Sequence, residues 1–440
     1  MGSESRPMIR GIKNWRNDPE WLVLAIGLAV HAVILFVAIP MLATSLGSHY
    51  GVGFADDYDD IAWNLVSGNG YRLSPDTAET LMREPGYPFL LASVFSIFGN
   101  SLPAARGLNL LLMAATASGV IAVTRLPPNA RLVGAAATAL FLLHPGMLIA
   151  EARGGFEVLY ALCLVLFVWS LSRALSTQRM SDYFWTGLIL GSGVLVRSSL
   201  IALPLLILVL LLLRPGGARN WRLTFVRVAT LSAGMLLVAV PWIIRNYNVV
   251  GQIVPTATIS GIAAHVGEYV CRNSDTGRTL HDLDADARNE RAAIAGAEGY
   301  RFKNEYFPRF FSSQDEVEFS KLLLKNTIDY YASHPGVFLK CTGSNLVNFW
   351  IAGKNPLAST LNAIVQIPYL LLAVIGIVWL SRTAYRDVQL LPIMVIVVYT
   401  MLLHAVTFAQ ARYSVPLVPL LAILAAYPAA RAWSYVTTKR

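Results

Sequence analysis

Aspartates occupy four of five consecutive positions near the beginning of the chain: Asp56, Asp57, Asp59 and Asp60. Acidic residues in the first turn of a helix complement its dipole and usually stay in solvent, which is the simplest interpretation of Asp59 and Asp60. Asp56 and Asp57 immediately precede the predicted helix. A carboxylate there can cap the helix, or it can act as a general base that takes a proton from an attacking hydroxyl. The residues alone leave Asp56 and Asp57 as equal candidates.

A second pair of charges, Arg83 and Glu84, lies on a stiff turn. Pro85, Gly86 and Pro88 follow directly in the sequence, and proline and glycine together fix a sharp change of chain direction. An ordinary surface ion pair is one explanation of Arg83 and Glu84. Because a rigid turn holds both charges beside the acidic helix, we favour a role for them in a site.

Several more charges lie at the predicted ends of membrane helices. Charges in such places often only reach the membrane interface, but these converge on the side that also holds the aspartates. Arginine suits phosphate through its planar fork of donors. A cleft with arginines on one side and carboxylates on the other would let an acceptor hydroxyl attack a phosphate-activated carbon, while the arginines stabilise the departing phosphate. The charged residues concerned are Glu151, Arg153, Glu157, Arg197, Arg245 and Arg412.

Other chemistries find little support. The chain has no glycine-rich phosphate loop of the Walker type, no HExxH and no CxxC, and its seven histidines are scattered. The acidic cluster could hold a divalent cation, but no coordination set is fixed, so we predict no metal and no cofactor. The net charge of +9 comes largely from basic residues in short turns. That pattern is typical of membrane topology, not of nucleic-acid binding.

The elements that must position these residues are membrane helices. Only 14% of the residues are charged and 55% are hydrophobic, and apolar runs near 20 residues long, enough to span a bilayer, recur along the chain. We therefore predict an all-α polytopic membrane protein with about ten spans and both termini on one side. The predicted spans are 21–43, 103–124, 132–150, 156–174, 183–197, 199–213, 223–244, 357–380, 390–408 and 413–433.

The basic residues set the predicted orientation. They gather in the N-terminal tail, in four turns on the same side and at the C-terminus, which predicts a cytoplasmic location for that side. The aspartates would then face the periplasm or the cell exterior, and the protein would lie in a bacterial cytoplasmic membrane. These basic residues are Arg6, Arg10, Lys13, Arg16, Arg125, Arg131, Arg173, Arg179, Arg214, Arg219, Arg222, Arg382, Arg386, Lys439 and Arg440.

Two outward segments are not membrane spans. The first outward loop, residues 44–102, should contain two short helices along the membrane surface, because the apolar stretch at 87–99 is too short to span. We divide the chain into an N-terminal membrane module (1–244), an outward subdomain (245–356) and C-terminal membrane helices (357–440). Cys271 and Cys341 lie in the outward subdomain, where an oxidising compartment permits a disulfide.

At this point the order of the motifs resembles the GT-C superfamily of membrane glycosyltransferases. It is similar to the branch of protein O-mannosyltransferases and lipid A aminoarabinose transferases. The matching pieces are "DDYDDIAWNLVSGNGY", "REPGYPFLLASVFSIFG", "AARGLNLLL", "FEVLYALCLVL", "LVRSSLIALP", "PWIIRNYNVVG" and "ARYSVPLVPLLAILAA". They run from the first predicted helix to the last, so the resemblance covers nearly the whole chain.

The resemblance implies an inverting transferase that uses a polyprenyl-phosphate sugar as donor and a glycan, lipid or protein as acceptor. It places the catalytic acid in the first outward loop, at Asp56 or Asp57. Many relatives place that acid where this chain has Phe54, and between the two aspartates we favour Asp57. The expected substrate-binding residues are Tyr58, Arg83, Glu84, Tyr87, Arg153, Glu157, Arg197, Arg245, Arg412 and Tyr413.

Two other classes of function are possible. A lipid-linked glycan transporter would be favoured by ionisable residues buried midway along membrane helices and by internal repeats. The strongest charges here lie at outward helix ends instead, and the sequence has no evident repeat. A non-catalytic scaffold would leave the proline-braced Arg83 and the converging arginines without a purpose. We therefore predict the transferase, with the transporter as the alternative.

Overall fold

The computed structural model describes residues 18–46, 53–54, 56–126, 131–213, 220–303 and 307–438. Part of the basic pattern that predicts the orientation lies outside these residues, namely Arg6, Arg10, Lys13, Arg16, Arg214, Arg219, Lys439 and Arg440. The described chain is almost entirely helical, with one short pair of antiparallel strands, β1 (Phe302–Lys303) and β2 (Arg309–Phe310). The predicted fold class, an all-α polytopic membrane protein, is confirmed.

Seven helical segments of the described chain are long and apolar enough to cross a membrane. The first combines α1 (Pro19–Val33), the π-helical turn η2 (Ile34–Ala38) and α2 (Ile39–Leu46). The others are α5 (Leu102–Thr124), α8 (Glu157–Thr177), α11 (Trp221–Val250), α16 (Pro356–Leu380), η7 (Arg386–Leu390) with α17 (Leu391–Val406), and η8 (Ala411–Leu417) with α18 (Val418–Thr438).

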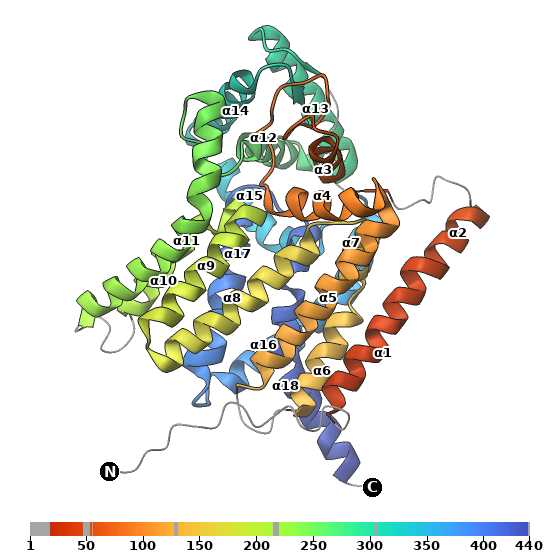
Figure 1. Ribbon diagram of the computed structural model, residues 1–440, viewed down its shortest axis with the longest axis vertical. Helices are drawn as coiled ribbons and strands as arrows, with labels where there is room; N and C mark the ends of the chain where they lie inside the picture. Colours follow the sequence, from red (N-terminus) through yellow and green to blue (C-terminus); the bar gives the residue numbers. More distant parts are fainter. Residues whose placement is uncertain are drawn as a thin grey trace.

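The remaining predicted spans are shorter or broken. The stretch predicted as one span at 132–150 is bent by 54° between α6 (Arg131–Leu142) and α7 (Pro145–Ala152). Proline cannot donate the hydrogen bond that a continuous helix needs at this point, so Pro145 begins a new helix. The stretches at 183–197 and 199–213 form α9 (Met180–Val196), the 3₁₀ turn η4 (Ser198–Ala202) and α10 (Leu203–Leu213), which lie within the helical bundle in Figure 1.

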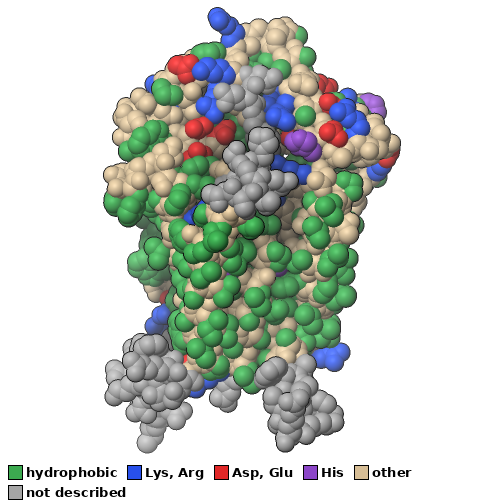
Figure 2. Space-filling model, turned by 90° about the vertical axis from the view of Figure 1, so that its right-hand side faces the viewer, with side chains coloured by type: hydrophobic (Ala, Val, Ile, Leu, Met, Phe, Trp, Pro, Cys, Tyr) green, Lys and Arg blue, Asp and Glu red, His purple; other side chains and the backbone are tan. Residues whose placement is uncertain are grey.

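A group of helices covers one end of the bundle (Figure 1). We call α3, α12, α13, α14 and the two strands the cap, and α4 and α15 lie between the cap and the membrane helices. Figure 2 shows hydrophobic side chains over the bundle and acidic and basic side chains gathered around the cap. The bounds of these helices are α3 (Tyr58–Val66), α4 (Gly86–Phe98), α12 (Ile259–Arg272), α13 (Leu280–Ala297), α14 (Ser313–Ser333) and α15 (Pro335–Ile351), with a 3₁₀ turn η6 (Ser274–Thr276).

The two helices predicted for the first loop are present as α3 and α4. Tyr58 and Ile61 on α3 are buried, whereas Asp59 and Asp60 lie in its first turn and remain partly exposed. The basic turns between α5 and α6, between α8 and α9, and between α16 and α17 lie at the opposite end of the bundle from the cap (Figure 1). The aspartates and the basic turns therefore lie at opposite ends, as predicted.

Small residues bring α9 and α11 into close contact. A Cβ atom added to Gly187 would lie 2.0 Å from the carbonyl oxygen of Leu231, and one added to Gly234 would lie 2.4 Å from that of Phe184. Larger side chains would force the two backbones apart, as in other tightly packed membrane helix pairs. This contact fixes α9, whose C-terminal end carries Arg197.

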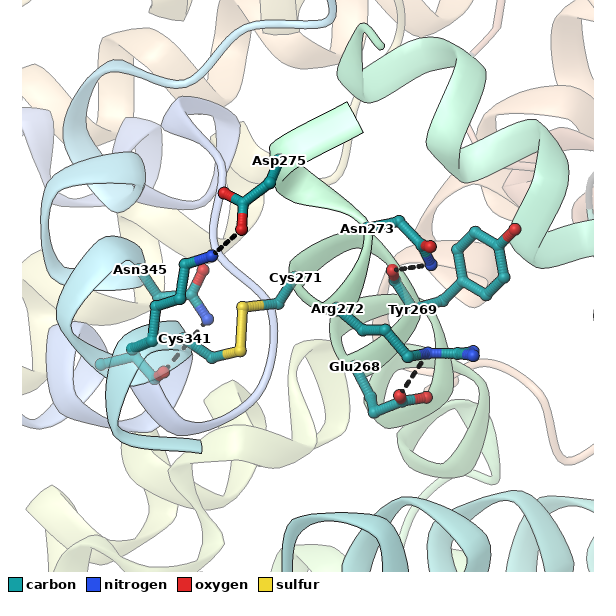
Figure 3. The surroundings of a disulfide bond; sticks show 10 residues. Glu268, Tyr269, Cys271, Arg272, Asn273, Asp275, Cys341 and Asn345 are labelled. Atoms are coloured by element: carbon teal, nitrogen blue, oxygen red, sulfur yellow. Dashed lines mark hydrogen bonds and ion pairs between the residues drawn. A yellow bond between two sulfur atoms is a disulfide. The ribbon is translucent and has the colours of Figure 1, made fainter. Parts of the chain in front are cut away.

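A disulfide joins the cap to the membrane-proximal helix α15. Figure 3 shows Cys271, near the end of α12, bonded to Cys341 on α15. The two Cα atoms lie 5.7 Å apart, within the usual range for a disulfide. The bond between residues 70 positions apart therefore holds α12 against the end of the helical bundle.

Candidate active site

A cavity of about 140 Å³ lies where the cap meets the ends of the membrane helices. Its walls come from the first loop, the ends of α8 and α9, the helices α12 and α13, and the segment around η8. The lining residues are Asp56, Arg83, Phe156, Arg197, Ile259, Ile262, Ala263, Val266, Leu280, His281, Asp284, Arg288, Arg291, Phe307, Lys354, Phe408, Gln410, Arg412 and Tyr413.

Arg412 joins two carboxylates at this cavity. Its Nη1 donates a hydrogen bond to Asp56 Oδ1 at 3.0 Å, its Nη2 donates to Asp56 Oδ2, and its Nε donates to Glu157 Oε1. Burial by itself would raise the pKa of the Asp56 carboxyl. The positive charge of Arg412, with those of Arg83 and Arg153, outweighs burial and lowers that pKa to about 2. Asp56 is therefore ionised and held by a bidentate arginine.

Asp57 has a different environment. It is not among the residues that line the cavity, and its Oδ2 atom is buried without a hydrogen-bond partner among the described residues. Arg309 Nη2 lies 4.0 Å away. Burial raises the pKa of the Asp57 carboxyl above its ordinary value, because the nearby charges of Arg83 and Arg309 do not fully compensate.

The backbone at both aspartates is left-handed. The φ angles are 67° at Asp56 and 59° at Asp57. In the described chain, only Gln178 is another non-glycine residue with positive φ. Aspartate tolerates this region better than most residues, but the conformation still costs of order 1 kcal/mol or more at each position. Strain of this kind is concentrated at functional sites.

Two other arginines line the cavity, and neither forms an ion pair with a carboxylate among the described residues. Arg83 is only 5% exposed, with its guanidinium 3.7 Å from the ring centre of Phe307 and 5.1 Å from that of Tyr58. Its Nε and Nη2 atoms have no hydrogen-bond partner among the described residues. Arg197 lies 5.4 Å from each of the rings of Phe156 and Tyr413. A buried cation without an ion pair is costly, so the guanidinium of Arg83 is suited to bind an anion, and the half-buried Arg197 adds a second positive charge at the same cavity.

Glu316 on α14 holds the loop that carries Arg83. Its carboxylate accepts hydrogen bonds from the Thr80 hydroxyl at 2.7 Å, the Leu81 amide at 2.8 Å and the Thr258 hydroxyl at 2.7 Å. Arg83 follows Leu81 by two residues, and α12 begins directly after Thr258. One buried carboxylate from the cap therefore fixes two walls of the cavity.

Glu84, the residue after Arg83, links the turn that carries Arg83 to the end of α9. Its Oε1 atom accepts hydrogen bonds from the amide of Ser198 at 2.9 Å and from the hydroxyl of Ser198 at 2.6 Å. A Cβ atom added to Gly86 would lie 2.8 Å from the carbonyl oxygen of Leu195. The turn thus packs against the end of α9 and holds Arg83 near Arg197. Glu84 itself is not in the cavity lining.

Three further predicted residues also lie behind the lining. The Tyr87 hydroxyl donates to the carbonyl oxygen of Gly154 at 2.6 Å, and the Tyr58 ring packs edge-on against Tyr87 at 5.6 Å between ring centres. Arg245 donates to Glu79 Oε2 at 3.0 Å.

The structure brings several of the predicted site residues together at the cavity. Glu157 is bound to Arg412, and Arg153 is close enough to influence the pKa of Asp56. The predicted residues that line the cavity are Asp56, Arg83, Arg197, Arg412 and Tyr413.

Sequence reasoning missed the cap side of the cavity. His281, Asp284, Arg288 and Arg291 follow one another at intervals of three and four residues on α13, which places them on one helical face. Lys354, in the turn before α16, completes this wall. This spacing of three and four residues was the signal in the sequence that could have identified the cap side of the cavity. Among the described residues, no three His, Cys, Asp or Glu side chains converge as a metal site.

The chain is similar to known membrane glycosyltransferases. Residues 82–244 match the family model described as dolichyl-phosphate-mannose-protein mannosyltransferase. A comparison with curated proteins finds no match.

Two similar solved structures are of an archaeal oligosaccharyltransferase from Archaeoglobus fulgidus. The apo form has a TM-score of 0.55 at 13% identity and covers 94% of this chain and 51% of its own. The complex of AglB with an inhibitory peptide and a dolichol-phosphate has a TM-score of 0.54 at 12% identity and covers 92% and 50%. This chain thus spans about half the length of these proteins.

A third similar structure is ArnT from Cupriavidus metallidurans bound to undecaprenyl phosphate. It has 16% identity, covers 93% of this chain and 78% of its own, and its TM-score of 0.42 is too low to add to the argument on the fold. The oligosaccharyltransferase structures and the family model point the same way. They confirm that this chain resembles the GT-C superfamily of membrane glycosyltransferases and shares its fold.

Proposed function

We propose that this protein is an inverting glycosyltransferase that moves a sugar from a polyprenyl-phosphate donor to an acceptor hydroxyl. The observation that carries the proposal is the placement of three arginines, Arg83, Arg197 and Arg412, around one cavity together with the carboxylate of Asp56. The cavity lies at the junction of the membrane helices and the cap, where a lipid-linked phosphate and a water-soluble group can meet. The match to the mannosyltransferase family model supports the same reaction class.

In the proposed reaction the acceptor oxygen attacks the anomeric carbon of the donor sugar. The new bond forms as the bond from that carbon to the phosphate oxygen breaks, and its electron pair leaves with polyprenyl phosphate. Arg83 and Arg197 stabilise the negative charge that develops on the phosphate. The proton of the acceptor hydroxyl passes to a carboxylate, for which Asp56 is the group that lines the cavity.

The choice of Asp56 departs from the sequence-based preference for Asp57. A carboxylate with a pKa of about 2 is a weak base in the empty site. Donor phosphate bound beside Arg412 would share the positive charge of that arginine, which would raise the pKa of Asp56 and make it a better base. Asp57, with its raised pKa and its position next to the cavity wall, is the alternative base.

We further propose that the cap faces the outside of a bacterial cytoplasmic membrane. The basic turns at the opposite end favour this orientation through the positive-inside rule. The Cys271–Cys341 bond between the cap and α15 supports it, because disulfides persist in oxidising compartments.

The disulfide gives a direct test of this orientation. Reducing the bond with an impermeant phosphine in intact cells should lower the thermal stability of the protein, because a constraint on a loop of 70 residues contributes roughly 2–4 kcal/mol. A double Cys271→Ser, Cys341→Ser variant is the control and should show the lower stability without reductant. If the bond resists the reagent until the cells are opened, the proposed orientation is wrong.

The transporter alternative retains one specific observation. His31 on α1 and Glu151 on α7 are buried, with 2.5 Å between His31 Nδ1 and Glu151 Oε2, and paired ionisable residues within membrane helices often mark transport pathways. Unlike Asp56 and Arg412, they do not line the cavity. The buried pair keeps the transporter as the second candidate, and its distance from the cavity lining ranks it below the transferase.

One comparison separates the two functions. Polyprenyl lipids and cell-envelope glycans should be analysed by mass spectrometry in source cells with and without the gene, after an impermeant reagent has modified the lipid-linked sugars that are accessible on the outer side. A transferase predicts that one polyprenyl-phosphate sugar accumulates on the outer side of the membrane while that sugar disappears from an envelope component. A transporter predicts that the lipid-linked precursor accumulates on the cytoplasmic side, an outcome that would reject the proposed reaction.

A further inference from the structure

A second cavity, of about 250 Å³, lies beside the candidate active site, which we call the first cavity here. Leu280 and Phe408 line both cavities. The turn before α16 also runs between them, since Lys354 lines the first cavity while its neighbour Asn355 lines the second. Single side chains therefore separate the two cavities, and neighbouring units of one extended ligand can occupy both.

The second cavity differs from the first in its chemistry. In its described lining Arg278 is the one charged residue, and it forms an ion pair with Asp286. Amides and hydroxyls, which offer both hydrogen-bond donors and acceptors, take the place of the charges. The hydroxyls of a neutral sugar also donate and accept, so this lining suits a sugar better than an anion. The uncharged polar residues include Ser274, Ser344, Asn345, Asn348, Asn355 and Ser359.

Helix α15 supplies a polar wall of the second cavity. Ser344, Asn345 and Asn348 follow Cys341 by three, four and seven residues, which places all four on one helical face. Figure 3 shows Asn345 on α15 near the bond between Cys341 and Cys271, and Cys271 itself lines the cavity. The disulfide therefore holds the polar face of α15 towards α12, with the second cavity between them.

Three asparagine side chains of this cavity retain hydrogen-bonding capacity. Asn345 is only 7% exposed, and its Nδ2 donates to the carbonyl oxygen of Ala405 at 3.1 Å, which leaves its Oδ1 as an acceptor. The Oδ1 of Asn355 accepts from the amide of Ala358 at 2.8 Å, which leaves its Nδ2 as a donor. The side chain of Asn348 forms no hydrogen bond within the described residues. The cavity thus presents a fixed acceptor, a fixed donor and a complete amide.

We propose that the second cavity binds a neutral sugar unit of the acceptor, next to the unit that carries the attacking hydroxyl. This inference rests on the proposed transferase function and names its acceptor class as a glycan of at least two sugar units. Phe408, in the shared wall, lies 6.0 Å from Tyr413 between ring centres. It adds an apolar surface for the C–H face of a sugar, and a mixed apolar and polar lining is typical of small-molecule sites.

The position of the second cavity favours the acceptor over the donor as the source of this sugar. The proposed donor carries its sugar directly on the phosphate, which is expected beside Arg197 and Arg412 in the first cavity. Neither arginine lines the second cavity. Its lining reaches the protein surface at the exposed Ser274 and Asn355, where a longer glycan can continue into solvent. A donor with more than one sugar is the other source, and the experiment distinguishes the two.

The test uses the full-length protein in nanodiscs. The acceptor is the envelope component isolated from cells that lack the gene, used intact and after trimming to the one sugar unit that receives the transferred sugar. Ser344→Trp, which places a large ring in the second cavity, should raise the KM for the intact acceptor at least tenfold. Asn348→Ala should raise it about three- to tenfold, the effect of one or two neutral hydrogen bonds. The KM for the donor and for the trimmed acceptor should change less than about twofold.

Val347→Trp is the matched control, because Val347 lies on the same helix, is 56% exposed and does not line the second cavity. The inference is overturned if wild-type protein has the same KM for intact and trimmed acceptor, if Ser344→Trp and Val347→Trp behave alike, or if the acceptor contains no glycan. A rise in the donor KM of Ser344→Trp with an unchanged acceptor KM would assign the second cavity to a donor with more than one sugar. Absence of transfer by wild-type protein to either acceptor would instead contradict the proposed function.

Discussion

Replacing Asp56 by asparagine should lower the rate of sugar transfer roughly 100- to 10,000-fold, the usual contribution of a general base. Asparagine keeps the shape of the side chain but cannot accept the proton of the acceptor hydroxyl. It also carries no charge to pair with Arg412, so Glu157 would be the one carboxylate still paired with Arg412 among the described residues. The measurement is the initial rate of transfer by purified protein, using the donor that the lipid comparison identifies.

The same substitution should also cost stability. The pKa of Asp56 is about 2 in the folded protein against an ordinary value of 3.8, so its ionised form stabilises the fold above about pH 4. That contribution is lost as the pH falls through 2, and it is roughly 2 kcal/mol. A small loss of thermal stability in Asp56→Asn is therefore expected, and rates must be compared on folded protein.

Two neighbouring aspartates provide the controls. Burial and the charge of Asp60 raise the pKa of Asp59 to about 6, so Asp59→Asn should leave activity near wild type and stability at pH 7 equal or higher. Asp57→Asn decides between the candidate bases. If it abolishes transfer while Asp56→Asn remains active, the sequence-based preference for Asp57 is right and the role proposed here for Asp56 is wrong.

The elements of this fold were largely predictable because hydropathy has a strong local signal. A membrane span needs about 20 apolar residues in succession, and most of the predicted spans match helices within a few residues. The break at Pro145 was missed, although the sequence "HPG" inside the stretch at 132–150 contained the signal for it. The stretch is long enough for one span, but a proline inside it bends the helix.

The site was only partly predictable because its contacts join distant parts of the chain. Asp56 and Arg412 are separated by 356 positions, and no local pattern pairs them. The general argument that outward helix ends converge selected Arg197 and Arg412, which line the cavity, but it also selected Arg245, which donates to Glu79 and does not line it. Topology predicts the end of the bundle at which a residue lies, whereas the direction of its side chain depends on packing.

The α13 side of the cavity was missed for a different reason. In the sequence, "LHDLDADARNER" has closely mixed acidic and basic residues, a pattern typical of a solvated helix stabilised by its own ion pairs. Some of these charges do pair at the surface, as Arg278 and Asp286 do. The other face of the helix closes the cavity, and only the docking of the cap on the bundle determines which face that is.

Replacing Arg83 by alanine should lower kcat/KM for the donor by roughly 100- to 1,000-fold, the effect of removing one preorganised donor to a developing negative charge. Arg83→Lys should recover only part of this, because lysine keeps the charge but lacks the planar fork and the stacking on Phe307 and Tyr58. Arg245→Lys is the matched control. Arg245 also stacks on two aromatic rings, those of Tyr71 and Trp242, but does not line the cavity, so its variant should retain near-normal donor kinetics.

Chemical rescue separates a role in phosphate binding from a role in packing. Guanidinium ion at low concentration should restore part of the activity of Arg83→Ala, because it can enter the vacated space between the Phe307 and Tyr58 rings and donate to the donor phosphate. A purely structural arginine would show lower thermal stability and no rescue. If Arg83→Ala keeps a normal KM and kcat for the donor, Arg83 does not bind the phosphate in the proposed reaction. Arg197 and Arg412 would then have to bind it without Arg83.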